Sequence, residues 1–97
     1  MYLLNAFSVQ MITDQLEKSG EVTVTFKKVD SLPGNLESAV GHADTAAVLG
    51  VPMNRINVKL NSGDTAYIAQ LQGGRLPEGS TTLPEGFKFT NIEARVS

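Results

Sequence analysis

The chain has 97 residues, a net charge of −2 at pH 7, no cysteine and 41% hydrophobic residues. This length fits one small domain over residues 1–97, and a core of that size is commonly supplemented by oligomerisation. The charge argues against a broad basic face for duplex nucleic acid. The absence of cysteine excludes disulfides and thiolate ligands, and a single histidine makes a zinc site improbable.

The chain shows no sequence signal for export or membrane insertion. Residues 1–5 lack the charged head and apolar run of a signal peptide. No apolar stretch approaches the ~20 residues that span a bilayer. We therefore expect a cytoplasmic protein without a membrane partner.

The first half of the chain predicts two strands and two helices. Residues 2–5 are short and apolar, as in a buried strand, and apolar residues recur at helical spacing over residues 8–19. Residues 21–28 alternate in type and are rich in β-branched residues, which predicts a second strand. After a turn at residues 30–34, we expect a short helix that starts at residue 33 or 35 and ends at residue 40.

The second half predicts one helix and three strands. Small residues occupy positions 43–49, a helical segment that the sequence Gly50-Val51-Pro52 ends. Polar and apolar residues alternate over 54–60 and strand-forming residues fill 65–71, and the turn at residues 61–64 between them predicts a hairpin. A glycine-rich loop follows, and an alternating strand over residues 87–96 closes the chain.

These elements predict an α/β fold, with one mixed sheet of about five strands flanked by helices that cover one face. The aromatic side chains are expected to belong to the core rather than to a surface that stacks on bases; they are Tyr2, Phe7, Phe26, Phe87 and Phe89.

His42 is the single histidine, and histidine is the side chain whose ordinary pKa, ~6.5, lies near neutral pH. It follows Gly41 and opens the helix predicted over residues 43–49, where backbone N–H groups favour anions. Acid–base chemistry at pH 7 would fall on His42 or on a retuned carboxylate. A proton donor beside an anion-binding helix end suggests phosphate chemistry.

Four segments, in this order, match one family. They are Tyr2-Leu3-Leu4-Asn5-Ala6-Phe7-Ser8, Gly41-His42-Ala43-Asp44-Thr45, Asn54-Arg55 and Arg75-Leu76-Pro77-Glu78-Gly79. No single segment is specific, but together they span nearly the whole chain. The chain thereby resembles the viral type III anti-CRISPR ring nucleases, small proteins of archaeal viruses, phages and some prokaryotic genomes.

The resemblance implies a homodimer that binds cyclic tetra-adenylate, the second messenger of type III CRISPR complexes, across its interface. It implies cleavage to linear di-adenylates without a metal or other cofactor, so that effector nucleases stay inactive. It also implies that His42 is the general acid and that Glu78 belongs to the catalytic site. The residues expected to bind the ligand are Asn5, Ser8, Asp44, Thr45, Arg55, Gln70 and Arg75.

The chain departs from the family at Asp44, because the family often has a hydroxyl residue two positions after the histidine. An acid there could repel a phosphate, act as a carboxylate at the helix N-terminus, or hydrogen-bond the imidazole. The loop before Arg75 also carries two glycines, and the equivalence of Gln70 depends on the register of this loop.

Ring opening needs few protein groups, because the ribose 2′-OH can attack its own 3′-phosphate and expel the 5′-oxygen. Alignment of the reacting atoms is worth ~7–11 kcal/mol in intramolecular cases, and a histidine that protonates the leaving oxygen contributes ~10²–10⁴-fold. Arginines suit the phosphates because the guanidinium can hold two oxygens at once. Glu78 could orient an arginine or accept a hydrogen bond from the 2′-OH.

Each residue also has a structural interpretation. His42 and Ser8 are typical helix caps, Arg55 and Arg75 typical surface cations, and Glu78 a typical turn residue. Two other functions therefore stay open: a module that sequesters a cyclic oligonucleotide without cutting it, and a small viral structural or interaction dimer.

Overall fold

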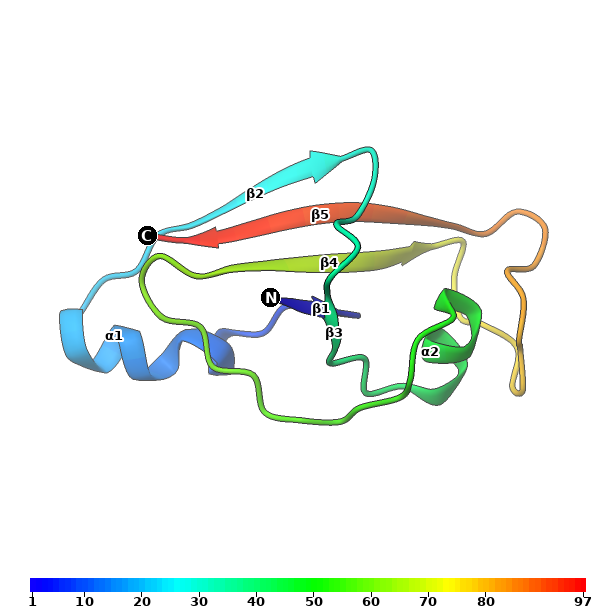
Figure 1. Cartoon of the computed structure of the whole chain (residues 1–97), viewed down its shortest axis with the longest axis horizontal. Coiled ribbons are helices and arrows are strands. Elements are labelled where there is room, and N and C mark those ends of the chain that lie inside the picture. Colours follow the sequence, from blue (N-terminus) through cyan, green and yellow to red (C-terminus); the bar gives the residue numbers. More distant parts are fainter.

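A mixed five-stranded sheet organises the molecule. The computed structural model describes all 97 residues, and the strand order is β2-β5-β4-β1-β3 (Figure 1). The strands are β1 (Tyr2–Leu4), β2 (Val24–Val29), β3 (Glu37–Ser38), β4 (Thr65–Gln72) and β5 (Lys88–Val96). β1 runs parallel to β3 and β4, whereas β5 is antiparallel to both β4 and β2. The predicted fold class is confirmed.

Three short helical segments accompany the sheet. The 3-10 turn η1 (Val9–Ile12) leads into α1 (Thr13–Ser19), and α2 (Ala43–Leu49) follows β3. α1 and α2 lie at opposite ends of the molecule (Figure 1). Both end at a glycine with positive φ, 74° at Gly20 and 73° at Gly50, a conformation that glycine adopts without steric cost. Neither helix has the length and apolar character needed to cross a membrane.

The helices pack on opposite faces of the sheet, so the expectation of one covered face is wrong. Ile12 of η1 belongs to the buried cluster that contains Ala66 and Ile68. Ala46 of α2 belongs to a second cluster, with Tyr67 and Ala69. Successive residues of a strand point to opposite faces, so the four consecutive buried residues of β4 require cover on both sides.

The segment between β2 and β3 is extended, and the helix expected to end at residue 40 is absent. It crosses the face of the sheet that carries the second cluster (Figure 1), where Leu32 and Leu36 pack. β3 then joins the edge of β1, since the N–H of Glu37 donates to the carbonyl of Met1. A helix this short is costly to nucleate, whereas the free edge of β1 offers hydrogen bonds at once.

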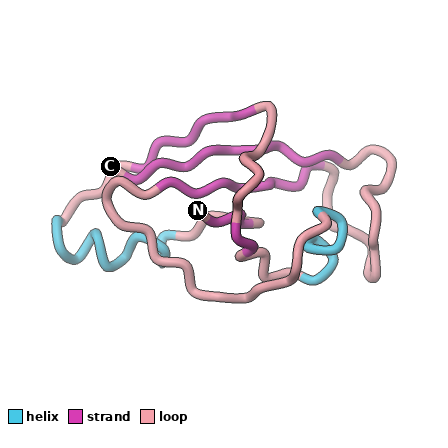
Figure 2. Tube along the Cα trace, in the orientation of Figure 1, coloured by secondary structure: helices cyan, strands magenta, loops and turns pink.

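The strand predicted over residues 54–60 is a loop, part of the pink segment along the lower margin of Figure 2. Its alternation is real, because Val58 and Leu60 are buried and their neighbours are exposed. No adjacent strand forms a ladder with it, and isolated backbone bonds hold it, such as Leu60 N–H to the carbonyl of Met11. Residues 61–64 form a turn, but they do not join two paired strands.

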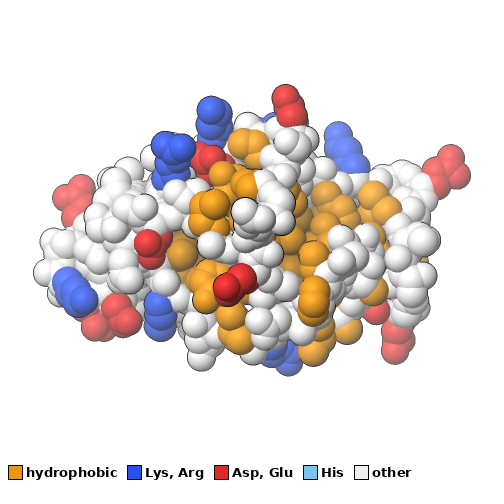
Figure 3. All heavy atoms as spheres, viewed as in Figure 1, with side chains coloured by type: hydrophobic (Ala, Val, Ile, Leu, Met, Phe, Trp, Pro, Cys, Tyr) orange, Lys and Arg blue, Asp and Glu red, His pale blue; other side chains and the backbone are white.

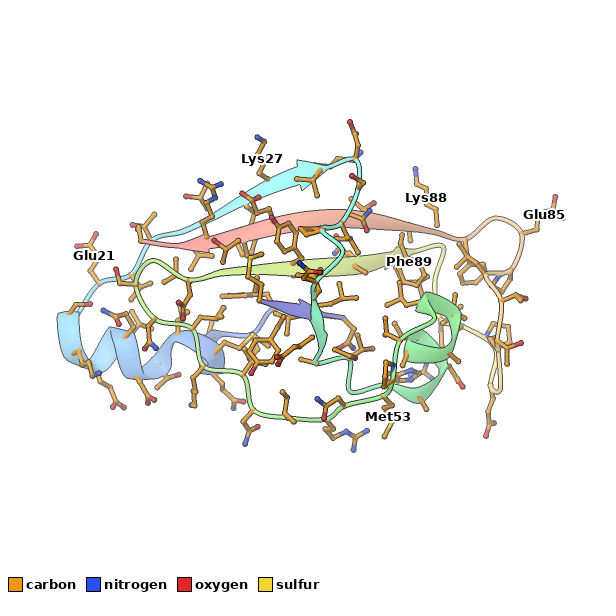
Figure 4. All side chains as sticks on the ribbon, in the orientation of Figure 1. Glu21, Lys27, Met53, Glu85, Lys88 and Phe89 are labelled. Carbon is orange, nitrogen blue, oxygen red and sulfur yellow. The ribbon has the colours of Figure 1, made fainter.

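Hydrophobic side chains gather beside the crossing segment on the face shown in Figure 3, while most charged groups lie around the margin and a few acidic ones lie on the face itself. Phe89 of β5 points toward α2 and packs on the second cluster (Figure 4). Phe26 is the aromatic residue that departs from the expected core, because its side chain is 52% exposed. It packs edge-to-face on Phe7, with ring centroids 5.4 Å apart.

Candidate functional site

The candidate residues come from the segments that follow three parallel strands. β1, β3 and β4 run in the same direction, with Leu3 beside Ser38 and Leu4 beside Ile68, so their carboxyl ends lie at one edge of the sheet. Asn5 follows β1 directly and the segment with His42 follows β3. The loop of residues 73–86, which carries Glu78, follows β4. Such an edge is where α/β proteins commonly form ligand crevices.

His42 is the N-cap residue of α2, and its imidazole is exposed. Its Nδ1 accepts a hydrogen bond from the backbone N–H of Thr45 at 3.4 Å and lies 3.3 Å from the Thr45 hydroxyl. The helix start therefore differs from the anion site expected from the sequence, because the ring itself takes one of the free N–H groups. The predicted ligand contact Thr45 is buried and serves to orient the imidazole.

Arg55 lies against the residue that precedes His42. Its Nε and Nη2 both donate to the carbonyl of Gly41, at 3.1 and 2.9 Å. A Cβ added to Gly41 would lie 3.4 Å from the Cγ of Arg55, so the two segments approach closely here. The side chain is exposed, and three of its five N–H groups stay free for a ligand.

The loop of residues 73–86 reaches α2 at one point. The backbone N–H of Gly79 donates to Oδ1 of Asp44 at 3.3 Å. The next residue before Gly79 is Glu78, so its backbone lies beside the helix that His42 opens. Both Glu78 and Arg75 are exposed, and neither side chain forms a hydrogen bond or an ion pair.

Asn5 and Gln70 lie together in another part of the edge. Both line a hollow of about 410 Å³ whose other walls include Phe7, Phe26 and Ile92. Ser8 lines a separate polar hollow of about 300 Å³ beside Lys59. Its side chain caps no helix, although its carbonyl accepts a bond from Met11 N–H.

The structure thus divides the predicted site into groups. His42, Asp44, Thr45, Arg55 and the Glu78 segment are linked by hydrogen bonds around the start of α2. Asn5 and Gln70 share a hollow, and Ser8 lies in another. The Arg75 side chain forms no hydrogen bond or ion pair with any of them. No three histidine or acidic side chains converge into a group that could hold a metal ion.

Sequence reasoning missed a polar network in the middle of the sheet. The Tyr67 hydroxyl donates to Oε2 of Glu93 at 2.9 Å, and Nε of Arg95 lies 2.7 Å from Oε1 of the same carboxylate. The bond from Tyr67, with Arg95 nearby, lowers the pKa of Glu93, while the same bond and burial raise the pKa of Tyr67. Tyr67 and Glu93 are direct cross-strand partners, a register that the sequence did not specify.

Comparison with known proteins agrees with this fold. The structure matches B116 of Sulfolobus turreted icosahedral virus with a TM-score of 0.67 and 27% identity, over 97% of each chain. No curated protein matches the sequence. The family model described as STIV B116-like matches residues 1–93. The chain therefore belongs to the STIV B116-like family, named after a small protein of an archaeal virus.

Proposed function

We propose that the protein is a metal-independent ring nuclease that cleaves cyclic tetra-adenylate to linear di-adenylates and so counters type III CRISPR signalling in the host cytoplasm. The observation that carries this proposal is the arrangement around His42. One imidazole, the guanidinium of Arg55 and the Glu78 segment are linked to a single short helix start. The resemblance of four sequence segments to anti-CRISPR ring nucleases gives the substrate.

In the proposed reaction, a ribose 2′-oxygen bonds to the adjacent phosphorus and the bond from phosphorus to the 5′-oxygen breaks. His42 donates the proton that the leaving 5′-oxygen needs. The Glu78 carboxylate accepts a hydrogen bond from the attacking 2′-OH and takes its proton as the new bond to phosphorus forms. The substrate supplies the nucleophile, so the reaction requires neither a nucleophilic side chain nor a metal-bound hydroxide.

Phosphate binding is assigned to the arginines. Arg55 is held by the Gly41 carbonyl through two of its N–H groups, which orients the remaining three without neutralising the charge. Arg75 carries an unpaired charge on the glycine-rich loop. We assign the amide side chains of Asn5 and Gln70 to a base, because their hollow also has aromatic walls.

The proposed active form is a homodimer. A tetranucleotide ring can adopt a two-fold axis, which an isologous dimer also has. Each subunit would then present its His42 to one of two opposite phosphodiesters, so the expected products are two dinucleotides rather than one linear tetramer. Light scattering at the assay concentration is expected to give twice the chain mass of 10.4 kDa. A monomeric mass would contradict this assembly.

The decisive experiment is incubation of the purified protein with cyclic tetra-adenylate in EDTA, followed by chromatography and mass analysis. We expect linear di-adenylate that ends in a 2′,3′-cyclic phosphate or a 3′-phosphate. The all-2′-deoxy ring is the matched control and must stay intact, because it lacks the nucleophile. An intact ribonucleotide ring with a thermal shift would indicate a sequestering module, and an intact ring without one would indicate a structural protein. Activity lost in EDTA and restored by magnesium would contradict the metal-free reaction.

A further inference from the structure

Asp44 occupies a distinctive place between α2 and the loop of residues 73–86. It lies in the first turn of α2, is half-buried, and accepts the N–H of Gly79. The other hydrogen bonds of this loop are internal: Ser80 bonds to Pro77, and Phe87, where the loop ends, bonds to Pro84. The bond to Asp44 is therefore the one polar link from the loop to the rest of the molecule.

The loop has few other restraints. Leu76 is buried, with 6% of its surface exposed, and burial restricts the movement of an apolar side chain. The segment from Pro77 to Ser80 is a turn, and Gly79 has a positive φ of 78°. With Leu76 fixed at one side and Gly79 bonded to a carboxylate at the other, the intervening residues are held at two points. Glu78 lies between these points.

Asp44 is the acidic residue in the first turn of α2, which fits a carboxylate at the helix N-terminus, but its contacts support no role towards His42 or Arg55. The imidazole of His42 is bonded to Thr45, and the guanidinium of Arg55 is bonded to the Gly41 carbonyl. Asp44 thus neither orients the general acid nor pairs with the phosphate-binding arginine. The polar contact of its carboxylate is the backbone N–H of Gly79 in the loop. A hydrogen bond from an N–H to an ionised carboxylate is stronger than one to a neutral acceptor.

We infer that Asp44 is a positioning residue, which holds the Pro77–Gly79 segment, and with it the Glu78 carboxylate, against the end of α2 that carries His42. The inference rests on the proposed function for its consequence in catalysis. It replaces the expected ligand contact at Asp44 with an internal one. It also gives the acid two positions after the general acid a structural role, as the acceptor of a hydrogen bond from the loop.

The first test separates the effect of the hydrogen bond between Asp44 and Gly79 from the effect of the negative charge of Asp44. Asp44→Ala removes both, whereas Asp44→Asn keeps an oxygen that can accept the Gly79 N–H. In single-turnover cleavage of cyclic tetra-adenylate, we expect about a tenfold loss for Asp44→Ala and less than about a threefold loss for Asp44→Asn, as expected for one hydrogen bond to a charged group. Equal losses in both variants would overturn the inference, because they would assign the effect to charge.

A double-mutant cycle tests whether Asp44 acts through Glu78. In a Glu78→Gln background, Asp44→Ala is expected to change the rate by less than about twofold, since the group it positions is already disabled. Full additivity of the two losses would overturn the positioning role. Circular dichroism verifies that each variant folds. If Asp44→Ala does not fold, Asp44→Ser replaces it, because the shorter serine side chain cannot keep the same bond to Gly79.

The second test is independent of activity. Trypsin can cut after Arg75, which is exposed in the loop, and after Lys18, which is exposed at the far end of α1. Asp44→Ala is expected to accelerate the cut after Arg75 several-fold, with no change after Lys18, and Asp44→Asn is expected to behave as wild type. An unchanged Arg75 cut in Asp44→Ala would overturn the inference. Proteolysis can confirm the bond between Asp44 and the loop even if the wild-type protein leaves cyclic tetra-adenylate intact. In that case the proposed function and the positioning role in catalysis both fail, but the restraint of the loop by Asp44 stands.

Discussion

The Nδ1 atom of His42 and the Oγ1 atom of Thr45 lie 3.3 Å apart, and the same nitrogen accepts the Thr45 N–H at 3.4 Å. The backbone bond requires a lone pair on Nδ1, so the neutral ring carries its proton on Nε2, which has no protein partner. When both ring nitrogens are protonated, Nδ1 becomes a donor, and the nearby Thr45 hydroxyl oxygen can accept its hydrogen bond. The pair can therefore orient the ring in both charge states.

Removing the imidazole separates capping from catalysis. His42→Ala is expected to lower single-turnover cleavage ~10²–10⁴-fold and to destabilise the protein by about 0.5 kcal/mol through loss of the cap. His42→Asn should lose the same activity but keep the stability, because asparagine is a preferred N-cap residue. Rate measurements and denaturant titrations on both variants check this. Full activity in His42→Asn would refute the general-acid role.

The Thr45 hydroxyl should matter to the rate more than to the fold. Thr45→Val keeps the backbone bond and the shape but removes Oγ1, and we expect about a fivefold slower single turnover, which corresponds to ~1 kcal/mol for one hydrogen bond. Thr45→Ser restores the hydroxyl and should recover most of the rate. A rate that follows side-chain volume instead, with serine worse than valine, would show that packing is responsible.

The activity should depend on pH as expected for an acid. If His42 donates a proton to the leaving oxygen, the single-turnover rate falls as the pH rises, because an imidazolium is a far stronger acid than a neutral imidazole. Rates between pH 5 and 9 with saturating protein measure this directly. A rate that stays flat through pH 9 excludes His42 as general acid.

Arg55 is predicted to require a guanidinium and not only a charge. Lysine cannot bond the Gly41 carbonyl through two donors and still present others in a fixed plane. Arg55→Lys should weaken binding of cyclic tetra-adenylate about tenfold, with stability changed by less than about 0.5 kcal/mol because the side chain is exposed. Arg95→Lys is the matched control, and its binding should equal wild type. Calorimetric titration distinguishes the two variants, and equal affinities would remove Arg55 from the site.

The bond between Tyr67 and Glu93 should make stability depend on pH at both extremes. The lowered pKa of Glu93 contributes stability above its unfolded pKa, which is lost as the pH falls through the folded value. The raised pKa of Tyr67 contributes stability below its unfolded pKa, which is lost as the pH rises through the folded value. Tyr67→Phe should therefore be less stable than wild type near pH 7, with a smaller difference below about pH 4 and above about pH 10.

Denaturant titrations at the three pH values check this, with Tyr2→Phe as the control because the Tyr2 hydroxyl forms no hydrogen bond. A difference between wild type and Tyr67→Phe that is independent of pH would assign the effect to packing of the ring instead.

Local sequence determined the elements whose patterns are strongest. The helix at residues 43–49 was predicted with its observed bounds, because Gly41-His42 and Gly50 mark both ends. β4 and β5 followed from strand-forming residues of sufficient length. The sequence singled out His42 as the one histidine, and the resemblance of four segments to a known family supplied the other candidate residues.

Tertiary structure decided what depends on neighbours distant in the chain. Alternation over residues 54–60 reports burial of Val58 and Leu60, but a strand also needs a partner with free backbone groups, and none is adjacent. The two residues of β3 are a strand only because the edge of β1 accepts them. The link from Asp44 to Gly79 spans 35 positions. The sequence by itself determined which side chains are candidates for the proposed chemistry, and the packing of the sheet decided which of them meet, because side-chain type is local whereas proximity is not.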